Sequence, residues 1–183
     1  GTGEIIPKIH TAKASPWKSL DDKPIHTYSR SSPDETVQAL ERKLSELHNG
    51  AEAITFYSGQ ACTANLLSTV KPGEHIICSE QVYGTTRNFI EQELGKYASY
   101  SFVEPTYENL ERAILPDTRY ILIETPTNPL LTIVDLEQVQ NISDRYNIDW
   151  IFDNTFATMF LIDGFKYNAK AVYYSASKYI SGH

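Results

Sequence analysis

Apolar residues recur along the chain with two different spacings. Over residues 37–47 a valine and three leucines stand three or four positions apart, which predicts a helix with one apolar face. Ser32 is its expected N-cap, Pro33 suits the first helical position, and Glu35 completes a Ser-x-x-Glu capping box. Asn49-Gly50 is expected to end this helix.

Beyond residue 50, short apolar runs alternate with segments of helical spacing. The runs that predict strands are 53–57, 75–78, 100–103, 120–123, 150–152 and 171–174. The segments that predict helices are 60–70, 85–94, 107–114 and 136–146. Strands that alternate with helices imply an α/β domain with a mostly parallel sheet covered by helices.

The first 31 residues break this pattern. They contain Pro7, Pro16 and Pro24 and show little periodicity, so they are predicted to form an extended arm. The predicted organisation is therefore an N-terminal arm over residues 1–31 and an α/β domain over residues 32–183.

Composition narrows the class of protein. A chain of 183 residues that is 41% hydrophobic can bury a substantial core. Its formal net charge of -7 argues against a nucleic-acid partner or an anionic membrane, because both would require a basic face. Small anionic ligands remain compatible with a local site.

Cysteines and apolar runs bear on the cellular setting. Cys62 and Cys78 have no close partner, and no His/Cys cluster has the spacing of a zinc site, so no metal is expected. A reducing cytoplasmic setting fits best, and no apolar run reaches membrane-spanning length. The chain begins at Gly1, has Met159 as its only methionine and stops at His183, so we expect a piece of a longer protein.

Chemically suggestive residues follow the last two predicted strands. Asp153 ends the strand 150–152, and Lys178 follows the strand 171–174 together with Ser175 and Ser177. An amine that can form an imine, a carboxylate to face a ring nitrogen and hydroxyl donors for a phosphate are what pyridoxal phosphate (PLP) requires. Alternatively, Asp153 caps the next turn and Lys178 is an ordinary surface lysine.

Three further sites are candidates at strand ends. Ser58-Gly59-Gln60 lies between a predicted strand and a helix, where a glycine lets the backbone approach a phosphate, although the turn alone can require one. Tyr83 can stack on a ring or serve in proton transfer, or it can pack in the core. Asn128, in the loop Thr125-Pro126-Thr127-Asn128-Pro129, can donate its amide to a ring oxygen or simply belong to a turn.

The predicted arm contains one more candidate. Tyr28-Ser29-Arg30 lies too early in the chain to belong obviously to the same crevice. Arginine binds phosphate through parallel donors, so the arm of a partner subunit can complete a site, although a solvated arm charge is the plainer explanation.

Taken in order, these motifs resemble one enzyme family. The matching segments are Tyr28-Ser29-Arg30, Ser58-Gly59-Gln60-Ala61, Val82-Tyr83-Gly84, Thr125-Pro126-Thr127-Asn128-Pro129, Phe152-Asp153-Asn154-Thr155 and Ser175-Ala176-Ser177-Lys178-Tyr179-Ile180-Ser181-Gly182-His183. Together they resemble the PLP-dependent enzymes of Cys/Met metabolism, which include cystathionine γ-synthase, cystathionine γ- and β-lyases, methionine γ-lyase and O-acetylhomoserine sulfhydrylase.

The resemblance implies a fold and an assembly. The fold would be the PLP-transferase type I (aspartate aminotransferase-like) large domain, in a homodimer or homotetramer whose subunits share each site. Lys178 would carry the cofactor, Asp153 would pair with its ring nitrogen and Tyr83 would stack on the ring.

The resemblance also implies roles for the remaining candidates. Phosphate contacts would come from Ser58, Gly59, Gln60, Ser175 and Ser177, with Tyr28 and Arg30 from a neighbouring protomer. Asn128 would contact the ring hydroxyl or the substrate carboxylate, and Thr155 would support the pyridine end.

Several positions depart from the family pattern. Ser32-Pro33-Asp34 stands where the family has Asn-Pro-Thr, and Gln60 replaces a common methionine, a choice more typical of the sulfhydrylases. The arginine that usually follows the Tyr83 motif would align with Asn88, with Arg87 displaced by one, so the roles of both are open. The part of the family that carries the arginine for the substrate α-carboxylate would lie beyond His183.

The function predicted from these observations is PLP-dependent elimination or replacement at the γ- or β-carbon of sulfur-containing or O-activated amino acids. Cystathionine γ-synthase or γ-lyase chemistry, within transsulfuration and methionine or cysteine metabolism, is the favoured form. The O-acetylhomoserine sulfhydrylase reaction is an alternative, and a non-catalytic PLP-binding or assembly fragment is an alternative of another class.

Overall fold

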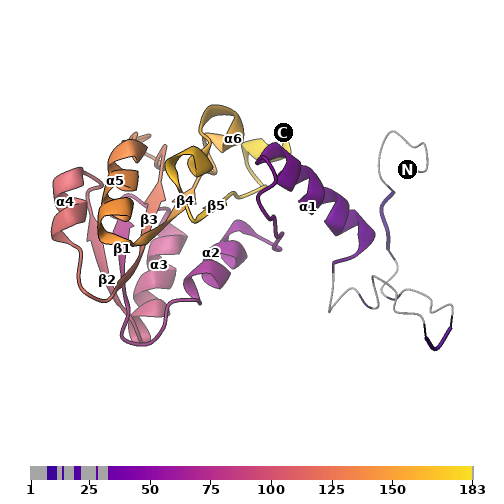
Figure 1. The fold of residues 1–183 in the computed structure, drawn as a ribbon, viewed down its shortest axis with the longest axis horizontal. Coiled ribbons are helices and arrows are strands. Elements are labelled where there is room, and N and C mark those ends of the chain that lie inside the picture. The colour runs from indigo at the N-terminus through magenta and orange to yellow at the C-terminus, as the bar shows by residue number, and fades with distance from the viewer. Residues whose placement is uncertain (1–7, 12–13, 15–18, 22–27, 29–32, 183) are drawn as a thin grey trace. The chain divides into compact units, whose positions relative to one another are not determined.

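The computed structural model describes residues 8–11, 14, 19–21, 28 and 33–182. The chain divides into two units, Gly1–Thr55 and Phe56–His183, and each is treated by itself (Figure 1). The predicted boundary between an arm and a domain, after residue 31, stays a prediction.

The first unit contains helix α1 (Glu35–Leu47), which agrees with the predicted helix at its C-terminal end. Its N-cap is Asp34, whose carboxylate accepts a hydrogen bond from the backbone N–H of Val37 at 2.9 Å. The sequence prediction of Pro33 at the first helical position was wrong, because Asp34 caps the helix two residues later than predicted. Ser32 lies outside the described residues.

One predicted strand does not form. Residues 51–56 have no regular secondary structure, and Ile54 and Tyr57 are largely exposed. A β-branched and aromatic run becomes a strand only where a neighbouring strand pairs with it. None of the described strands pairs with this segment, so the prediction of a strand at 53–57 was wrong.

The second unit is built on a parallel sheet of five strands among the described residues. They are β1 (His75–Ser79), β2 (Ser99–Val103), β3 (Thr118–Glu124), β4 (Asp149–Asp153) and β5 (Ala171–Tyr173). Their order across the sheet is β2-β1-β3-β4-β5, and every neighbouring pair is parallel. The predicted parallel α/β architecture is confirmed.

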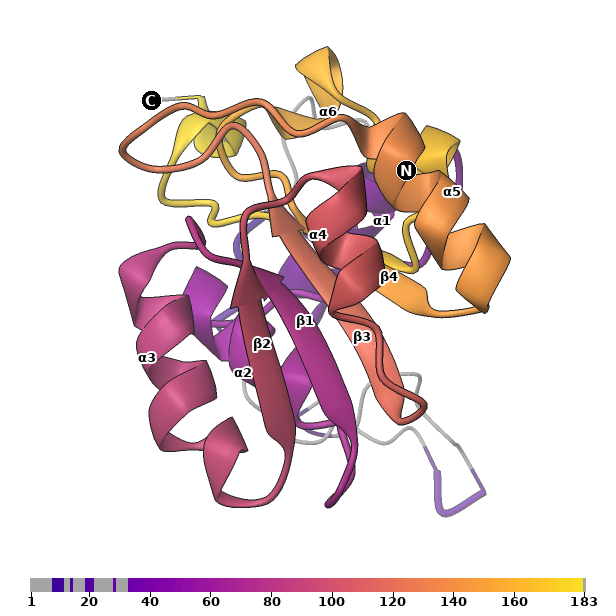
Figure 2. The same cartoon turned by 90° about the vertical axis from the view of Figure 1, so that its left-hand side faces the viewer.

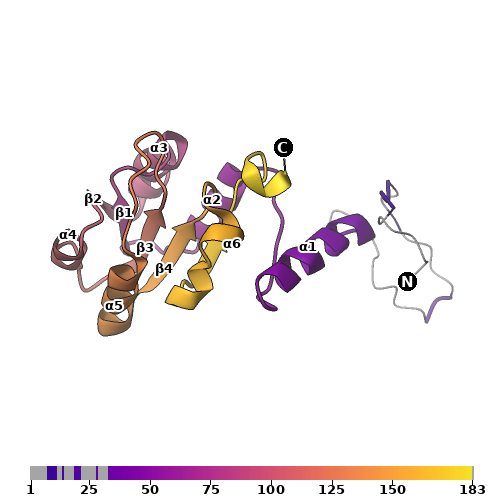
Figure 3. The same cartoon turned by 90° about the horizontal axis from the view of Figure 1, so that it is seen from above.

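Helices cover both faces of this sheet. The α-helices are α2 (Gly59–Leu67), α3 (Gly84–Gln92), α4 (Tyr107–Arg112), α5 (Leu136–Tyr146) and α6 (Thr158–Leu161), with 3-10 helices at Leu94–Lys96, Gly164–Tyr167 and Tyr179–Ser181. Helices α2 and α3 lie on one face and α4 and α5 on the other, as Figures 2 and 3 show. Among the described residues, no helix has the length and apolar character needed to cross a membrane.

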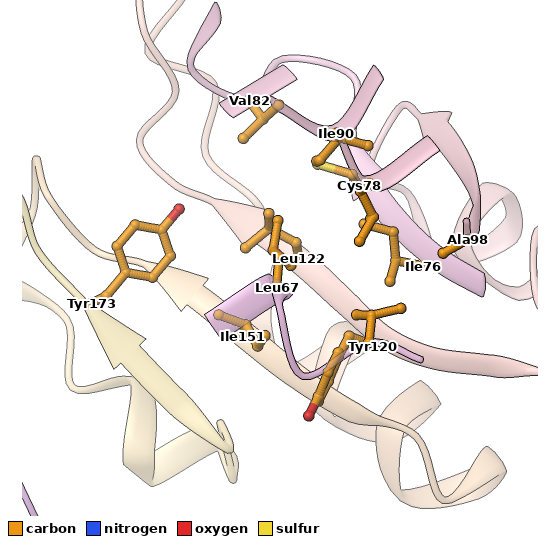
Figure 4. Close-up of a cluster of buried hydrophobic side chains, with 12 residues drawn as sticks. Leu67, Ile76, Cys78, Val82, Ile90, Ala98, Tyr120, Leu122, Ile151 and Tyr173 are labelled. Carbon is orange, nitrogen blue, oxygen red and sulfur yellow. The ribbon is translucent and has the colours of Figure 1, made fainter. Parts of the chain in front are cut away.

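Each face of the sheet has its own core, because successive residues of a strand point to opposite sides. Ile76 and Cys78 of β1 pack with α2 and α3 in a cluster that includes Leu122 (Figure 4). Ile77, between them in sequence, belongs to the opposite cluster, which includes Trp150 and the buried side chains of α4 and α5. The strands therefore appear in sequence as continuous apolar runs rather than alternating ones.

The strand order creates a switch point. β1 pairs with β2 on one side and with β3 on the other, and α3 and α5, which follow β1 and β3, cover opposite faces of the sheet. In open parallel sheets, the loops at such a point diverge and leave a crevice beyond the carboxyl ends of the strands. The crevice is thus expected beyond Ser79 and Glu124, the last residues of β1 and β3.

A buried histidine joins three strands at the opposite end of the sheet. His75 is 1% exposed; its Nδ1 lies 2.9 Å from Thr118 Oγ1 and its Nε2 lies 3.0 Å from Ser101 Oγ. Burial lowers the pKa of His75, and the charge of Asp117 opposes this in part. The ring therefore favours the neutral form, in which it bridges β2 and β3 from β1.

This lowered pKa predicts a loss of stability in acid. A histidine whose folded pKa lies below its unfolded value near 6.5 stabilises the fold above that pH, and this contribution is lost as pH falls. In urea unfolding, the native protein should lose stability relative to His75→Gln between about pH 7.5 and about pH 5.5. Parallel pH curves for the two proteins would contradict this assignment.

Candidate active site

A pocket of about 480 Å³ opens at the carboxyl edge of the sheet in the second unit. Small-molecule sites commonly measure about 300 to 1,000 Å³, so its size suits a cofactor with a small substrate. Its lining comes from the start of α2 and from the residues that follow β1, β3, β4 and β5. The pocket therefore lies where the strand order predicts a crevice.

Most residues that the sequence singled out meet in this pocket. The predicted site residues that line it are Ser58, Gly59, Gln60, Tyr83, Asn128, Asp153, Thr155, Ser175, Ser177 and Lys178. Tyr28 belongs to the first unit, where it forms an isolated antiparallel bridge with Ala14. Arg30 lies outside the described residues.

The start of α2 forms one wall of the pocket. Ser58 is the N-cap, and its Oγ accepts a hydrogen bond from the backbone N–H of Ala61 at 3.1 Å. Gly59 packs so closely on the β5 side that an added Cβ would lie 3.0 Å from Ser175 Cβ. The N-terminal amides of α2 and the Ser175 side chain thus lie side by side, an arrangement that suits an anion.

The side-chain amide of Gln60, in the same wall of the pocket, has an unpaired hydrogen-bond donor. Its Nε2 is buried and has no hydrogen-bond partner among the described residues. Buried amide donors are usually satisfied, so this unpaired donor indicates a site built for a polar ligand.

A buried carboxylate lies at the centre of the pocket lining. Asp153, the last residue of β4, is 7% exposed, and its Oδ1 accepts a hydrogen bond from the Thr155 N–H at 3.1 Å. Thr155 Oγ1 in turn accepts from the Ser175 N–H at 2.9 Å, which joins the ends of β4 and β5. Burial raises the pKa of Asp153, while the hydroxyls of Thr155 and Tyr173 act in the opposite direction. A cation placed against Asp153 would favour the ionised carboxylate and so offset the effect of burial on its pKa.

Lys178 supplies a cation to the pocket. It follows β5 and precedes the 3-10 helix Tyr179–Ser181, and its backbone N–H donates to Ser175 O at 3.0 Å. Its side chain is exposed at the pocket, and it is the one lysine or arginine among the described lining residues. The amine and the Asp153 carboxylate thus line one pocket from neighbouring strands.

A second buried carboxylate, Glu124, lines the pocket and was not predicted from the sequence. Glu124 ends β3 in register with Asp153 of β4, and it is 6% exposed. Its Oε2 accepts from the Tyr83 N–H at 2.6 Å, and its Oε1 accepts from the Asn128 N–H at 3.2 Å. Burial first, and then the charge of Asp153, raises the pKa of Glu124 to about 7, while these two N–H groups lower it.

A sequence signal for Glu124 was present. It follows an apolar strand directly, as Asp153 does, and that position was the reason for choosing Asp153. Of the other lining residues, Pro126 belongs to the predicted loop 125–129, whereas five carried no comparable signal: Thr63, Thr85, Thr86, Phe156 and Tyr173.

The structure gives Arg87 and Asn88 positions outside the pocket lining. The Arg87 guanidinium lies 4.0 Å from the centre of the Phe102 ring, and its Nε donates to Glu91 at 3.0 Å. Asn88 is exposed on α3. The lining residues that this helix contributes are Thr85 and Thr86. No group of three or more potential metal ligands occurs among the residues that the structure describes.

Comparison with protein families gives one match over most of the chain. Residues 8–183 match the family described as Cys/Met metabolism PLP-dependent enzyme. A protein named cystathionine beta-lyase from Coxiella burnetii is 36% identical over all of this chain and 48% of its own length. A Bacillus subtilis protein named cystathionine gamma-synthase/O-acetylhomoserine (thiol)-lyase is 32% identical over all of this chain and 49% of its own length.

Solved structures agree in fold. A cystathionine gamma-lyase from Lactobacillus plantarum, complexed with L-serine, superposes with a TM-score of 0.93 at 31% identity, covering all of this chain and 48% of its own. CalE6 from Micromonospora echinospora gives a TM-score of 0.92 at 34% identity, again covering all of this chain and 48% of its own. The chain spans about half the length of the relatives it matches.

The pocket residues fit PLP as a ligand. The start of α2, with the unpaired Gln60 Nε2, offers donors for its phosphate. Asp153 offers a buried anion for its pyridine nitrogen, and Lys178 offers an amine for its aldehyde.

The close approach of Gly59 to Ser175 leads to a test of this wall. Gly59→Ala should weaken PLP binding on the order of tenfold, because the new methyl must separate the α2 amides from Ser175 by a few tenths of an ångström. Titration of the apo-protein, followed by visible absorbance, measures the affinity. Gly84→Ala is the matched control, since Gly84 begins α3 and an added Cβ there meets nothing within 4 Å. Equal affinity in the two variants would contradict a close phosphate wall.

Proposed function

The chain belongs to the Cys/Met metabolism PLP-dependent enzyme family, and we propose that the complete protein uses PLP to catalyse elimination or replacement on a sulfur-containing or O-activated amino acid. The proposed bond change lies at the γ-carbon, as in cystathionine γ-synthase or γ-lyase, or at the β-carbon. The names of its relatives, which include beta-lyase, gamma-synthase and gamma-lyase, support this range of reactions.

One observation carries the proposal. Asp153 ends β4 and Lys178 follows β5, yet both residues line a single pocket, one wall of which is the start of helix α2. A buried carboxylate, an amine and a helix N-terminus at these three places meet the needs of the ring nitrogen, the aldehyde and the phosphate of PLP.

The residues of this chain take the following roles in the proposal. Ser58, Ser175 and Ser177 bind the phosphate by their hydroxyls, and Gly59 and Gln60 donate from the start of α2. Asp153 holds a proton on the ring nitrogen, and Thr155 orients Asp153 through the 3.1 Å hydrogen bond from its N–H. The ring of Tyr83 stacks on the cofactor, and the amide of Asn128 binds the ring hydroxyl or the substrate carboxylate.

PLP, when bound, withdraws electrons from the substrate α-carbon and so acidifies its proton. The amine of Lys178 would hold the cofactor, and the free amine would remove this proton as the general base. Lys178 lines the pocket after the end of β5, and Asp153 lines the same pocket at the end of β4. The Tyr83 hydroxyl is a second group for moving a proton in the same pocket.

The O-acetylhomoserine sulfhydrylase reaction is the second candidate. It is favoured by Gln60, which replaces the methionine common in the family, and by a relative whose name includes O-acetylhomoserine (thiol)-lyase. A non-catalytic PLP-binding or assembly role for the chain stays the alternative of another class.

We further infer a homodimer or homotetramer in the cytoplasm. In this assembly Tyr28 and Arg30 from a neighbouring protomer would bind the cofactor phosphate of this site. Arginine suits this role because its planar guanidinium donates two parallel hydrogen bonds to a phosphate.

The assignment of Lys178 is tested by trapping. The complete protein should show a visible absorbance band with PLP, and borohydride should fix the cofactor mass on the peptide that contains Lys178. Lys178→Ala should lose both signals and at least about a hundredfold in kcat. Lys170→Ala, an exposed lysine just before β5, is the control and should keep them. Attachment at another lysine would refute the proposed site.

The substrate class is tested by product analysis. The complete protein is supplied separately with cystathionine, with O-acetylhomoserine plus sulfide, and with homocysteine. Under the favoured form we expect cleavage of cystathionine, or its formation with release of acetate when cysteine replaces sulfide beside O-acetylhomoserine. Homocysteine formed from O-acetylhomoserine and sulfide indicates the sulfhydrylase. Failure with all three substrates would refute the substrate class.

A further inference from the structure

Glu124 is a buried carboxylate in the pocket lining, and the proposed mechanism assigns it no role. A buried carboxylate is costly unless hydrogen bonds or a counter-ion compensate it. Glu124 forms no ion pair among the described residues, and its carboxylate instead accepts two backbone hydrogen bonds. Its place in the fold explains what these two bonds achieve.

The two donors belong to the loops on either side of the crevice. Tyr83 follows β1, and Asn128 follows β3, the two strands between which the sheet order switches. Glu124 Oε2 lies 2.6 Å from Tyr83 N, and Oε1 lies 3.2 Å from Asn128 N. One carboxylate therefore joins the two loops, which are also linked where Gln81 Oε1 accepts from Thr127 Oγ1 at 3.0 Å.

This joint bears directly on the pocket. The side chains of Tyr83 and Asn128 both line it, and both are substantially exposed, so core packing does little to fix them. Tyr83 is also the N-cap of α3 and has no side-chain capping bond of its own. The bonds to Glu124 thus hold the Tyr83 and Asn128 backbones directly. They act beside a second link between the same loops, in which Gln81 Oε1 accepts from Thr132 Oγ1 at 2.6 Å.

We propose that Glu124 is a positioning residue, whose carboxylate holds the Tyr83 ring and the Asn128 amide in place over the bound cofactor. The inference rests on the proposed function for its cofactor and substrate. We call the two hydrogen bonds from the Tyr83 and Asn128 N–H groups to Glu124 the clamp. The clamp is present in the chain without cofactor or substrate.

The surroundings of Glu124 indicate that its ionised form lowers the stability of the folded protein. Asp153 on β4 and the Cys78 thiol on β1 face Glu124, and Lys178 lines the same pocket. Burial and the Asp153 charge raise the pKa of Glu124 to about 7. A raised folded pKa means that ionisation destabilises the fold, so the loss of stability develops as pH rises from the unfolded value through about 7.

Glutamine at position 124 separates positioning from simple structural support. Its single amide oxygen can accept from one N–H, while its NH₂ group opposes the other, so one arm of the clamp is lost. The same change removes the buried charge beside Asp153. Glu124→Gln should therefore loosen the site without lowering the stability of the apo-protein.

Three measurements on the complete protein test this, with Glu80→Gln, an exposed glutamate in the loop of Tyr83, as the control. Glu124→Gln should weaken PLP binding about tenfold to a hundredfold. Its Tyr83 or Asn128 amide should exchange hydrogen faster than in the native apo-protein. Its melting temperature should equal or exceed the native one, and by more at about pH 8 than at about pH 5.5. Glu80→Gln should change none of these.

Two outcomes would overturn the inference. One is unchanged PLP affinity together with unchanged exchange at both amides. The other is a parallel loss of apo-protein stability and PLP affinity at about pH 8, which indicates general structural support. If the native protein itself binds no PLP, the proposed function fails, whereas amide exchange and the pH dependence of melting still decide whether the clamp exists.

Discussion

Parallel pairing of the strands is the constraint on which this site depends. Because all five strands run the same way, their carboxyl ends meet at one edge of the sheet. Residues as far apart in sequence as Tyr83 and Lys178 therefore line one pocket. The reversal of strand order beside β1 then opens the crevice at the place where helices do not cover the edge.

The buried titratable groups at the two ends of the sheet have opposite effects on stability at neutral pH. At the amino ends of the strands, His75 favours its neutral form, because burial lowers its pKa and two hydroxyls bind its ring. At the carboxyl ends, burial raises the pKa values of Glu124 and Asp153, which lie in register on β3 and β4. Neutral His75 stabilises the fold at neutral pH, whereas ionised Glu124 and Asp153 destabilise it there. Buried charges of this kind are common at sites that bind a ligand.

The comparisons with known proteins establish the family, whereas the pocket supports the proposed cofactor site. Family membership follows from a match over residues 8–183, and relatives of about a third identity carry several reaction names. The pocket brings together a helix start, an amine and a buried carboxylate, the three groups proposed to bind the cofactor that the family shares. The leaving group is determined by contacts with the substrate, so product analysis is the experiment that identifies it.

The sequence alone determined the elements with clear local patterns. Helix α5 has the predicted bounds, because Asp135 caps it and its apolar residues repeat at helical spacing. Apolar runs between helices likewise indicated the parallel sheet, and the carboxylate after one of these runs indicated Asp153.

Only the tertiary structure decided the features that depend on partners distant in sequence. Residues 53–57 have strand-forming side chains, yet no described strand pairs with them. Glu124 looks like any carboxylate after a strand until the fold brings the Tyr83 N–H, 41 positions away, within 2.6 Å of it. Local spacing encodes which backbone bonds a segment can make with itself, whereas a bond across the crevice exists only after the sheet has assembled.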